Sequence, residues 1–163
     1  MLKKSDNFVA EAMLRAMGAE HGGSIPGGAK AAMASMRKHG ISSGDNLVMF
    51  DGSGLSRNNK LAPRVLMSLL KAFYNSYLKS GMTAMMAEPG GEGTLKKRLV
   101  GTPAQGRVWA KTGALRGACA LSGLFKRSNG DMAAFSMIMN NYTVHSNLIR
   151  AIQDRLVLLM IDL

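Results

Sequence analysis

The fold is decided by residues 107–140, which read RVWAKTGALRGACALSGLFKRSNGDMAAFSMIMN. Three apolar runs in this stretch have the length and composition of strands: Arg107–Thr112, Ala118–Lys126 and Met132–Asn140. The turn residues Ser128-Asn129-Gly130-Asp131 separate the last two runs, and an Asn-Gly pair is typical of a hairpin because both residues tolerate a positive φ. We therefore predict an antiparallel meander of three strands.

Helical patterns lie on both sides of this meander. Gly18 and Gly40 are expected to end the first two helices, and Pro63 suits the first turn of the third. The order of helices, then strands, then one helix indicates an α+β fold, an antiparallel sheet covered by helices. The remaining expected elements are helices at Ser5–Met17, around residues 29–39, from Pro63 to Tyr77 and from Asn147, a glycine-rich loop at 21–28, a short strand at Leu47–Phe50, and loop with short helix at 81–106.

The composition supports a folded core, since 47% of the 163 residues are hydrophobic and 19% are charged. The net charge is +11, but the basic residues are spread along the chain and aromatic residues make up only 6%. A nucleic-acid site needs stacking aromatics interleaved with the charge, so this partner is not expected. Attraction to an anionic polymer such as a cell wall is compatible with the charge.

No cofactor, metal site or membrane span is expected. The three histidines, His21, His39 and His145, have no paired ligand spacing, and no apolar run approaches the ~18 residues of a transmembrane helix. Polar residues at 5–7 interrupt any signal peptide at once, so the chain expressed as given is expected to stay in the cytoplasm. The single cysteine, Cys119, allows no internal disulfide.

Three motifs carry chemistry. They are Ser5-Asp6-Asn7 at the start of a predicted helix, Asp51–Asn59 (DGSGLSRNN) between a strand and a helix, and Lys111-Thr112-Gly113 at the end of a predicted strand. Singly they could be a helix cap, a glycine-rich turn and a strand-end lysine, and Ser56-Arg57-Asn58 repeats the Ser-x-Asn pattern. Ser-Asp-Asn and Lys-Thr-Gly together belong to the signature set of β-lactamases and penicillin-binding proteins.

The stretches Lys4–Glu11, Asp51–Arg57 and Lys111–Leu115 resemble consecutive landmarks of the penicillin-binding D-alanyl-D-alanine carboxypeptidase/endopeptidase family. The resemblance runs over nearly the whole chain. It implies that residues 1–163 are the C-terminal part of a penicillin-binding carboxypeptidase domain, with an incomplete β-lactamase/transpeptidase-like fold. It also implies a periplasmic serine acyl-transferase without a cofactor, with peptidoglycan stem peptides or β-lactams as ligands.

The resemblance assigns substrate binding to four consecutive residues. The Lys111 ammonium would supply positive field for the substrate carboxylate, and the Thr112 hydroxyl would donate a hydrogen bond to it. Gly113 has no side chain, so the substrate could lie against the strand. The N–H of Ala114 would form part of the oxyanion hole.

The resemblance assigns proton transfer to Ser5, placed between Lys111 and the leaving amine, and substrate orientation to the Asn7 amide. Ser5 and Lys111 must therefore meet, although they are 106 positions apart (111 − 5). The residues expected to shape the wall of the site are Asp51, Ser53 and Arg57.

The family's nucleophile, the serine of Ser-x-x-Lys, precedes the Ser-x-Asn element, and only four residues precede Ser5 here. Three other matches, Ser35–Lys38, Ser68–Lys71 and Ser76–Lys79, fall inside or late in predicted helices, whereas a working nucleophile needs a helix N-terminus. Ser35 with Ser56-Arg57-Asn58 and Lys111 would restore the family order as a miniature enzyme, but its serine lies mid-helix.

Three functions therefore stay open. The chain is a carboxypeptidase portion that becomes active only with a complementing N-terminal half, a non-catalytic module that binds peptide carboxylates, or a structural remnant. Three predicted strands where the family has five would leave an open sheet edge and bare apolar surface, so a homo-oligomer is the alternative to a complementing half.

Overall fold

The computed structural model describes residues 1–162. The chain divides into two compact units, which are described separately. The first unit contains Met1 with Asp6–Ala72, and the second contains Leu2–Ser5 with the chain from Phe73 onward.

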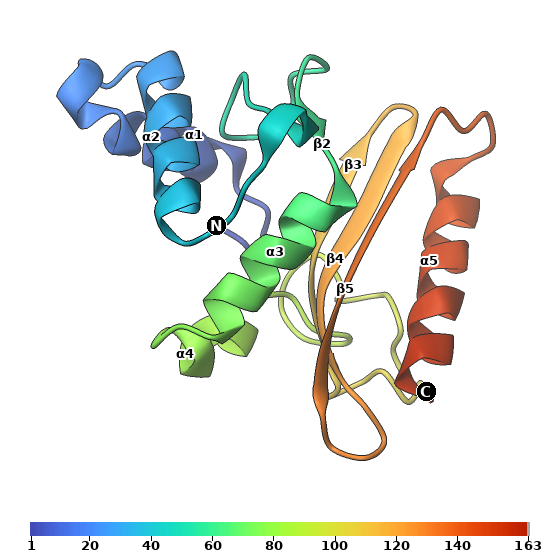
Figure 1. The fold of residues 1–163 in the computed structure, drawn as a ribbon. Helices are drawn as coiled ribbons and strands as arrows, with labels where there is room; N and C mark the ends of the chain where they lie inside the picture. The colour runs from blue at the N-terminus through green and yellow to red at the C-terminus, as the bar shows by residue number, and fades with distance from the viewer. Residues whose placement is uncertain (163) are drawn as a thin grey trace. The chain divides into compact units, whose positions relative to one another are not determined.

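The predicted meander is present in the second unit as an antiparallel sheet in the order β3-β4-β5 (Figure 1). Its strands are β3 (Val108–Leu115), β4 (Ala118–Lys126) and β5 (Met132–Asn140). The predicted bounds of β4 and β5 are confirmed, whereas β3 runs three residues further than expected. The reason is a two-residue hairpin at Arg116-Gly117, where Gly117 has a φ of 78°, so that Leu115 still pairs with Ala118.

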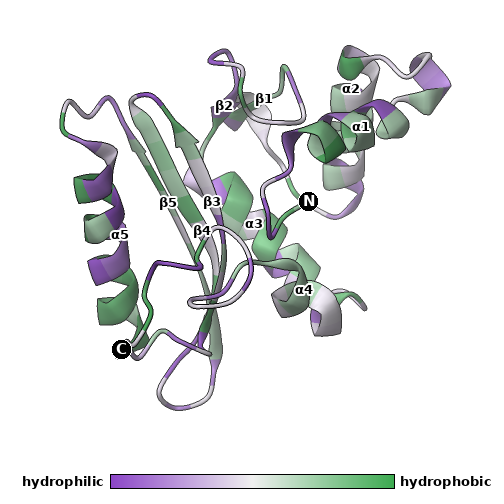
Figure 2. Cartoon of the chain, turned by 180° about the vertical axis from the view of Figure 1, so that it is seen from behind, coloured by the Kyte–Doolittle hydropathy of each residue, from purple (hydrophilic) through white to green (hydrophobic). Residues whose placement is uncertain are grey.

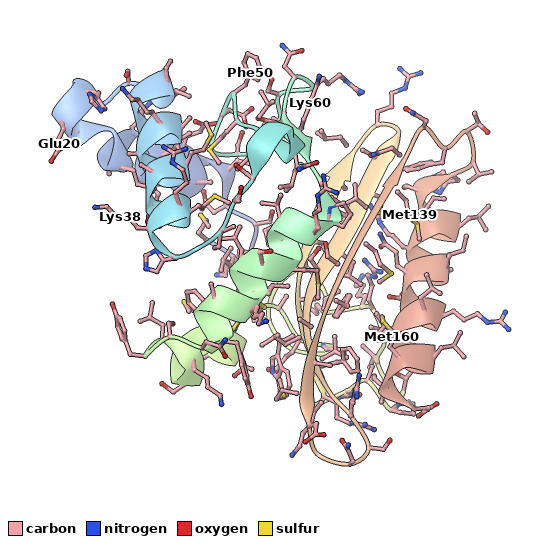
Figure 3. All side chains as sticks on the ribbon, viewed as in Figure 1. Glu20, Lys38, Phe50, Lys60, Met139 and Met160 are labelled. Carbon is pink, nitrogen blue, oxygen red and sulfur yellow. The ribbon has the colours of Figure 1, made fainter. Side chains whose placement is uncertain are left out.

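The closing helix α5 (Ser146–Ile161) lies along one face of this sheet (Figure 1). Apolar residues of the strands and of α5 form the core of the unit, and Figure 2 shows the strands as largely hydrophobic. The rings of Phe125 and Phe135 are 6.1 Å apart at a tilt of 58°, and the side chain of Met160, labelled in Figure 3, packs against the same cluster. Each large apolar side chain buried here contributes about 1.5–3 kcal/mol to stability.

A long connection without regular strands leads from α4 (Lys79–Met85) to β3. It is nevertheless well anchored, because Leu95 is completely buried and Leu99 is nearly so. Ala87 forms an isolated bridge with Ala110 on the outer side of β3. The sequence predicted loop with short helix here, and this expectation is confirmed.

The first unit begins with α1 (Asn7–Met17), whose N-terminus is capped by the Asp6 carboxylate through the Val9 N–H. Then come a 3-10 turn at Ala19–His21 and α2 (Ile25–Lys38). The predicted loop at 21–28 is wrong in its last four residues. The Ser24 hydroxyl caps α2 at Gly27, and Pro26 fits the first turn, so the helix starts despite two glycines.

The remaining elements of this unit are the 3-10 turn Gly44–Asn46, the two-residue strands β1 (Leu47–Val48) and β2 (Lys60–Leu61), and α3 (Pro63–Tyr74). Met36, Ile41 and Val65 form its small core. α3 ends before the predicted Tyr77 because the Ser76 hydroxyl donates a hydrogen bond to the Phe73 carbonyl and closes a turn.

Candidate active site

The outer edge of β3 is paired only in part. The Ala110 N–H donates to the Ala87 carbonyl over 2.8 Å, and the Ala87 N–H donates back over 3.2 Å. Alternate residues of a strand direct their backbone groups to the same side, so Thr112 and Ala114 also face this outer side. Within residues 1–162 no strand pairs with this outer side of β3 beyond Ala110, whereas β4 pairs with the other side as far as Leu115. The outer side of β3 therefore has backbone groups with which an added strand could pair.

Lys111 lies between these edge positions, and its side chain is largely buried. Its ammonium donates one hydrogen bond to the Ser5 hydroxyl, with the Lys111 Nζ and Ser5 Oγ atoms 2.7 Å apart, and another to the Thr112 carbonyl. The predicted proximity of Ser5 and Lys111 is thus confirmed. No described carboxylate forms an ion pair with Lys111. Desolvation by burial lowers the pKa of Lys111 below its ordinary value.

Ser5 itself has a left-handed backbone conformation, with a φ of 57°. A non-glycine residue in this region costs roughly 1–2 kcal/mol, and such strain is often found at functional sites. The preceding residues are held by a loop of the same unit, since the Thr94 N–H donates to the Lys3 carbonyl over 3.2 Å. No pattern in residues 90–94 predicts this contact, because a glycine-rich stretch of this kind is equally typical of an ordinary turn.

The other predicted site residues differ in their exposure and in whether they belong to the same unit as Lys111. Thr112 and Gly113 follow Lys111 on β3 and are partly exposed, and Ala114 is exposed. A Cβ on Gly113 would lie 3.3 Å from the Ala120 Cβ, which leaves little space on that side. Asn7 is the exposed first residue of α1 and belongs to the first unit, so its role stays a prediction.

The middle motif is organised by Asp51. One of its carboxylate oxygens accepts hydrogen bonds from the Gly54 N–H at 2.6 Å and the Asn59 amide at 3.0 Å, and the other accepts from the Ser56 N–H at 2.5 Å. Both carboxylate oxygens of Asp51 therefore accept hydrogen bonds from residues of the same loop. This use of Asp51 fits a role in building the loop more closely than a role in touching substrate.

Glu11 ends the first of the three landmark stretches, but the sequence assigned it no role. Its carboxylate accepts hydrogen bonds from the Ser53 N–H at 3.1 Å and the Gly52 N–H at 3.2 Å, so it fixes the other side of the loop. Desolvation opposes its ionisation, but these N–H donors hold the pKa of Glu11 below its ordinary value. A lone glutamate inside a helix pattern offers no sequence signal for such a contact.

The three Ser-x-x-Lys matches do not stand at helix N-termini. Ser35 lies well inside α2, and Ser68 lies inside α3 with its hydroxyl donating to the Arg64 carbonyl at 3.0 Å. Ser76 lies between α3 and α4, so its predicted place within a helix is wrong, and its hydroxyl donates to the Phe73 carbonyl at 2.7 Å. Among the described side chains, no group of His, Cys, Asp and Glu could hold a metal ion. None of the described helices combines the length and apolarity needed to cross a membrane.

The three-stranded sheet, with α5 along one face and Lys111-Thr112-Gly113 on β3, matches the fold of penicillin-binding proteins and β-lactamases. Penicillin-binding protein 4 (dacB) of Haemophilus influenzae, solved in complex with a β-lactam, matches the whole chain with a TM-score of 0.91 and 29% identity, and the match covers 40% of that protein's chain. The TLA-3 extended-spectrum β-lactamase matches 76% of the chain with a TM-score of 0.55 and 21% identity, a likeness of fold alone. The chain belongs to the D-Ala-D-Ala carboxypeptidase 3 (S13) family, whose model matches residues 1–162.

The chain is also similar to curated D-alanyl-D-alanine carboxypeptidases. It is 34% identical to the D-alanyl-D-alanine carboxypeptidase DacB of Haemophilus influenzae, over 88% of this chain and 31% of that protein. It is 32% identical to the D-alanyl-D-alanine carboxypeptidase of an Actinomadura species, over 94% of this chain and 29% of that protein. The chain therefore spans about a third of the length of the relatives it matches.

The strain at Ser5 predicts a difference between two substitutions. Ser5→Ala and Ser5→Gly both remove the hydroxyl, but only glycine relieves the left-handed conformation. Ser5→Gly should therefore be more stable than Ser5→Ala by about 1 kcal/mol in urea unfolding. Equal stabilities, or a more stable alanine variant, would show that the positive φ of Ser5 is not strained.

The buried ammonium predicts how stability changes with pH. Because the folded-state pKa of Lys111 lies below the unfolded value near 10.5, the unfolded state binds more protons between the two. The stability of the wild type relative to Lys111→Met should therefore be lowest at neutral pH and should rise as the pH approaches the unfolded pKa. Urea unfolding at several pH values measures this difference, with the exposed Lys126→Met as the matched control. A difference that falls with rising pH would contradict burial as the cause.

Proposed function

We propose that this chain provides the substrate-binding strand and the proton-transfer groups of a serine-type D-Ala-D-Ala carboxypeptidase. The observation that carries the proposal is the hydrogen bond of 2.7 Å between the partly buried Lys111 ammonium and the Ser5 hydroxyl, beside the outer edge of β3. The names of the relatives support the same reaction. The substrate would be a peptidoglycan stem peptide, and the place of action the periplasm.

The peptide substrate would bind along the outer edge of β3. The backbone groups of Thr112 and Ala114 face that side and could pair with an extended peptide. The terminal carboxylate of the substrate would meet the Lys111 ammonium and the Thr112 hydroxyl, while Gly113 leaves room beside the strand. The Ala114 N–H would stabilise the negative charge that develops on the carbonyl oxygen under attack.

Proton transfer would run through Ser5. In acylation, a serine oxygen bonds to the carbonyl carbon of the D-Ala-D-Ala amide, and the bond to the leaving D-alanine nitrogen breaks. The proton of the attacking serine must reach that nitrogen, and the Ser5–Lys111 pair offers a donor and acceptor path. Burial, which makes it easier for Lys111 to lose a proton, favours this role, while the Asn7 amide would orient the peptide. Water then hydrolyses the ester and restores the serine.

We assign the attacking serine to none of the three internal Ser-x-x-Lys matches. The hydroxyls of Ser68 and Ser76 are bonded to backbone carbonyls, and Ser35 lies inside α2. A nucleophile at a helix N-terminus would gain from the helix dipole and free N–H groups. Ser35 and Ser68 lie inside helices, and the Ser76 oxygen already accepts a hydrogen bond from the Leu78 N–H at 3.2 Å before α4 begins. A complementing segment would supply this serine, so these 163 residues alone should bind substrate without turning it over.

Peptide and penicillin binding test this function together. Titration with an Nα-acyl peptide ending in D-Ala-D-Ala should shift the amide NMR signals of Thr112, Gly113 and Ala114. Lys111→Met should reduce the affinity at least tenfold, because it removes the charge-assisted bond to the carboxylate, whereas the exposed Lys126→Met should not. Fluorescent penicillin should leave no covalent adduct on the chain alone. No peptide shift at β3 would refute the binding site, and an adduct mapped to Ser35, Ser68 or Ser76 would refute the complementing serine.

We further propose that apolar surface of the second unit is covered by a partner. The outer edge of β5 is unpaired within residues 1–162, and α5 exposes an apolar stripe on the face turned away from the core. The stripe residues are Leu148, Ile152, Leu156 and Leu159. Their spacing of three to four residues suits packing against a helix. A complementing segment would cover the stripe, and a second copy of the chain would do so when that segment is absent.

If a second copy of the chain covers the stripe on α5, the chain alone should self-associate. Light scattering at micromolar concentration should give a mass above that of a monomer, and Ile152→Lys should lower it, because a charge would enter the apolar contact. Asn147→Lys adds the same charge to an exposed α5 position outside the stripe and is the control. A monomer, or equal effects of both variants, would refute the stripe as a contact surface.

A further inference from the structure

The segment 88–98, which we name the bracket loop, begins beside the candidate active site. The residue before it, Ala87, exchanges two backbone hydrogen bonds with Ala110, the neighbour of Lys111 on β3. Within the loop, the Gly90 N–H reaches the Leu95 carbonyl at 3.4 Å, and the Leu95 side chain is completely buried. The first half of the loop is therefore tied both to the edge strand and to the core.

The other end of the bracket loop is fixed to α5 by Arg98. Its guanidinium donates to the Asp154 carboxylate, at 2.7 Å from Nη2 and 3.1 Å from Nε, and to the Gln153 side-chain oxygen at 3.2 Å. Gln153 is completely buried, and its amide donates to the Cys119 carbonyl at 3.3 Å. Cys119 is the register partner of Ala114, so this network also supports β4 opposite the proposed oxyanion donor.

The tip of the bracket loop, residues 92–94, holds the two residues that precede Ser5 in the sequence. The Thr94 N–H donates to the Lys3 carbonyl at 3.2 Å, and the Lys4 ammonium pairs with the Glu92 carboxylate at 2.8 Å. The ion pair is exposed and adds little by itself. The closest approach is at Gly93, where a Cβ would lie only 2.2 Å from the Lys3 carbonyl oxygen. Gly93 also has a φ of 110°, which side chains rarely adopt.

We infer that Gly93 is a positioning residue: the tip of the bracket loop fixes Lys3 and Lys4 and thereby sets the contact between Ser5 Oγ and Lys111 Nζ. The loop tip holds the backbone beside Ser5 through the Lys3 carbonyl, and only glycine at position 93 lets the loop approach that carbonyl so closely. The catalytic meaning of this contact rests on the proposed function, since a proton path tolerates little displacement. The contact itself does not depend on that function.

The test compares Gly93→Ala with Gly101→Ala. Gly101 has a φ of 71°, and a Cβ added there would meet no atom within 4 Å, so its substitution adds backbone strain without pressing on Lys3. In Gly93→Ala, the Thr94 amide should exchange with solvent at least tenfold faster. The NMR titration of the Lys111 side chain should also move toward the ordinary lysine value, because Ser5 and its neighbours no longer bury the ammonium. Gly101→Ala should change neither quantity.

Two outcomes would overturn the inference: a folded Gly93→Ala chain with both quantities unchanged, or equal changes in the two glycine variants. If Gly93→Ala fails to fold, Glu92→Lys decides, because it replaces the attraction to Lys4 by repulsion at an exposed position. It should speed Thr94 exchange two- to threefold, and an unchanged rate would refute the role of the tip. These readouts need no peptide, so their failure is distinguishable from a failure of the proposed binding function.

Discussion

An ammonium group that leaves water must replace its lost hydrogen bonds to water by hydrogen bonds to the protein. The arrangement around Lys111 follows from this constraint. The Lys111 Nζ is supplied with two oxygen acceptors, the Ser5 hydroxyl and the Thr112 carbonyl, and neither carries a formal charge. A carboxylate would compensate the charge more fully, but it would also compete with an anionic substrate. Neutral acceptors keep the positive field available, and they leave the pKa of Lys111 lowered by burial.

Several distant parts of the second unit are needed to keep these acceptors in place. Thr112 is held by the β3–β4 ladder, which itself lies on the core shared with α5. Ser5 depends on the bracket loop, which is tied to α5 through Arg98 and Asp154. The same helix therefore supports both hydrogen-bond partners of Lys111 by separate routes. This explains how a strained serine near the start of the sequence can take part in a contact 106 positions away.

The sequence predicted those features that depend on local pattern. The β4–β5 hairpin follows from alternation and the Asn129-Gly130 turn, and its bounds are confirmed. The meeting of Ser5 and Lys111 followed from a resemblance, because no periodicity connects them. The start of α2 was missed, since Gly27 and Gly28 suggested a loop. In fact Gly28 is required by packing, as a Cβ there would lie 1.9 Å from the Leu14 carbonyl oxygen. The close approach of Gly93 to Lys3 was missed for the same reason. In a sequence, a glycine required by close packing cannot be told from a glycine required by a turn.

The internal serines show why a motif match alone does not make a nucleophile. Inside a helix, a serine hydroxyl readily donates to the carbonyl four residues earlier, and Ser68 does this with Arg64. Such a hydroxyl is satisfied locally, and its neighbouring N–H groups are used within the helix, so no free donors surround it. Ser5 differs because it lies outside α1 in a left-handed conformation, where its oxygen accepts a hydrogen bond from the partly buried Lys111 ammonium. Because the Ser5 oxygen accepts a hydrogen bond from an ammonium, it suits the proposed proton relay better than attack on a carbonyl carbon. The contacts of the described residues are therefore compatible with the proposed recognition and proton transfer, and the proposed attacking serine would gain from a helix N-terminus of its own.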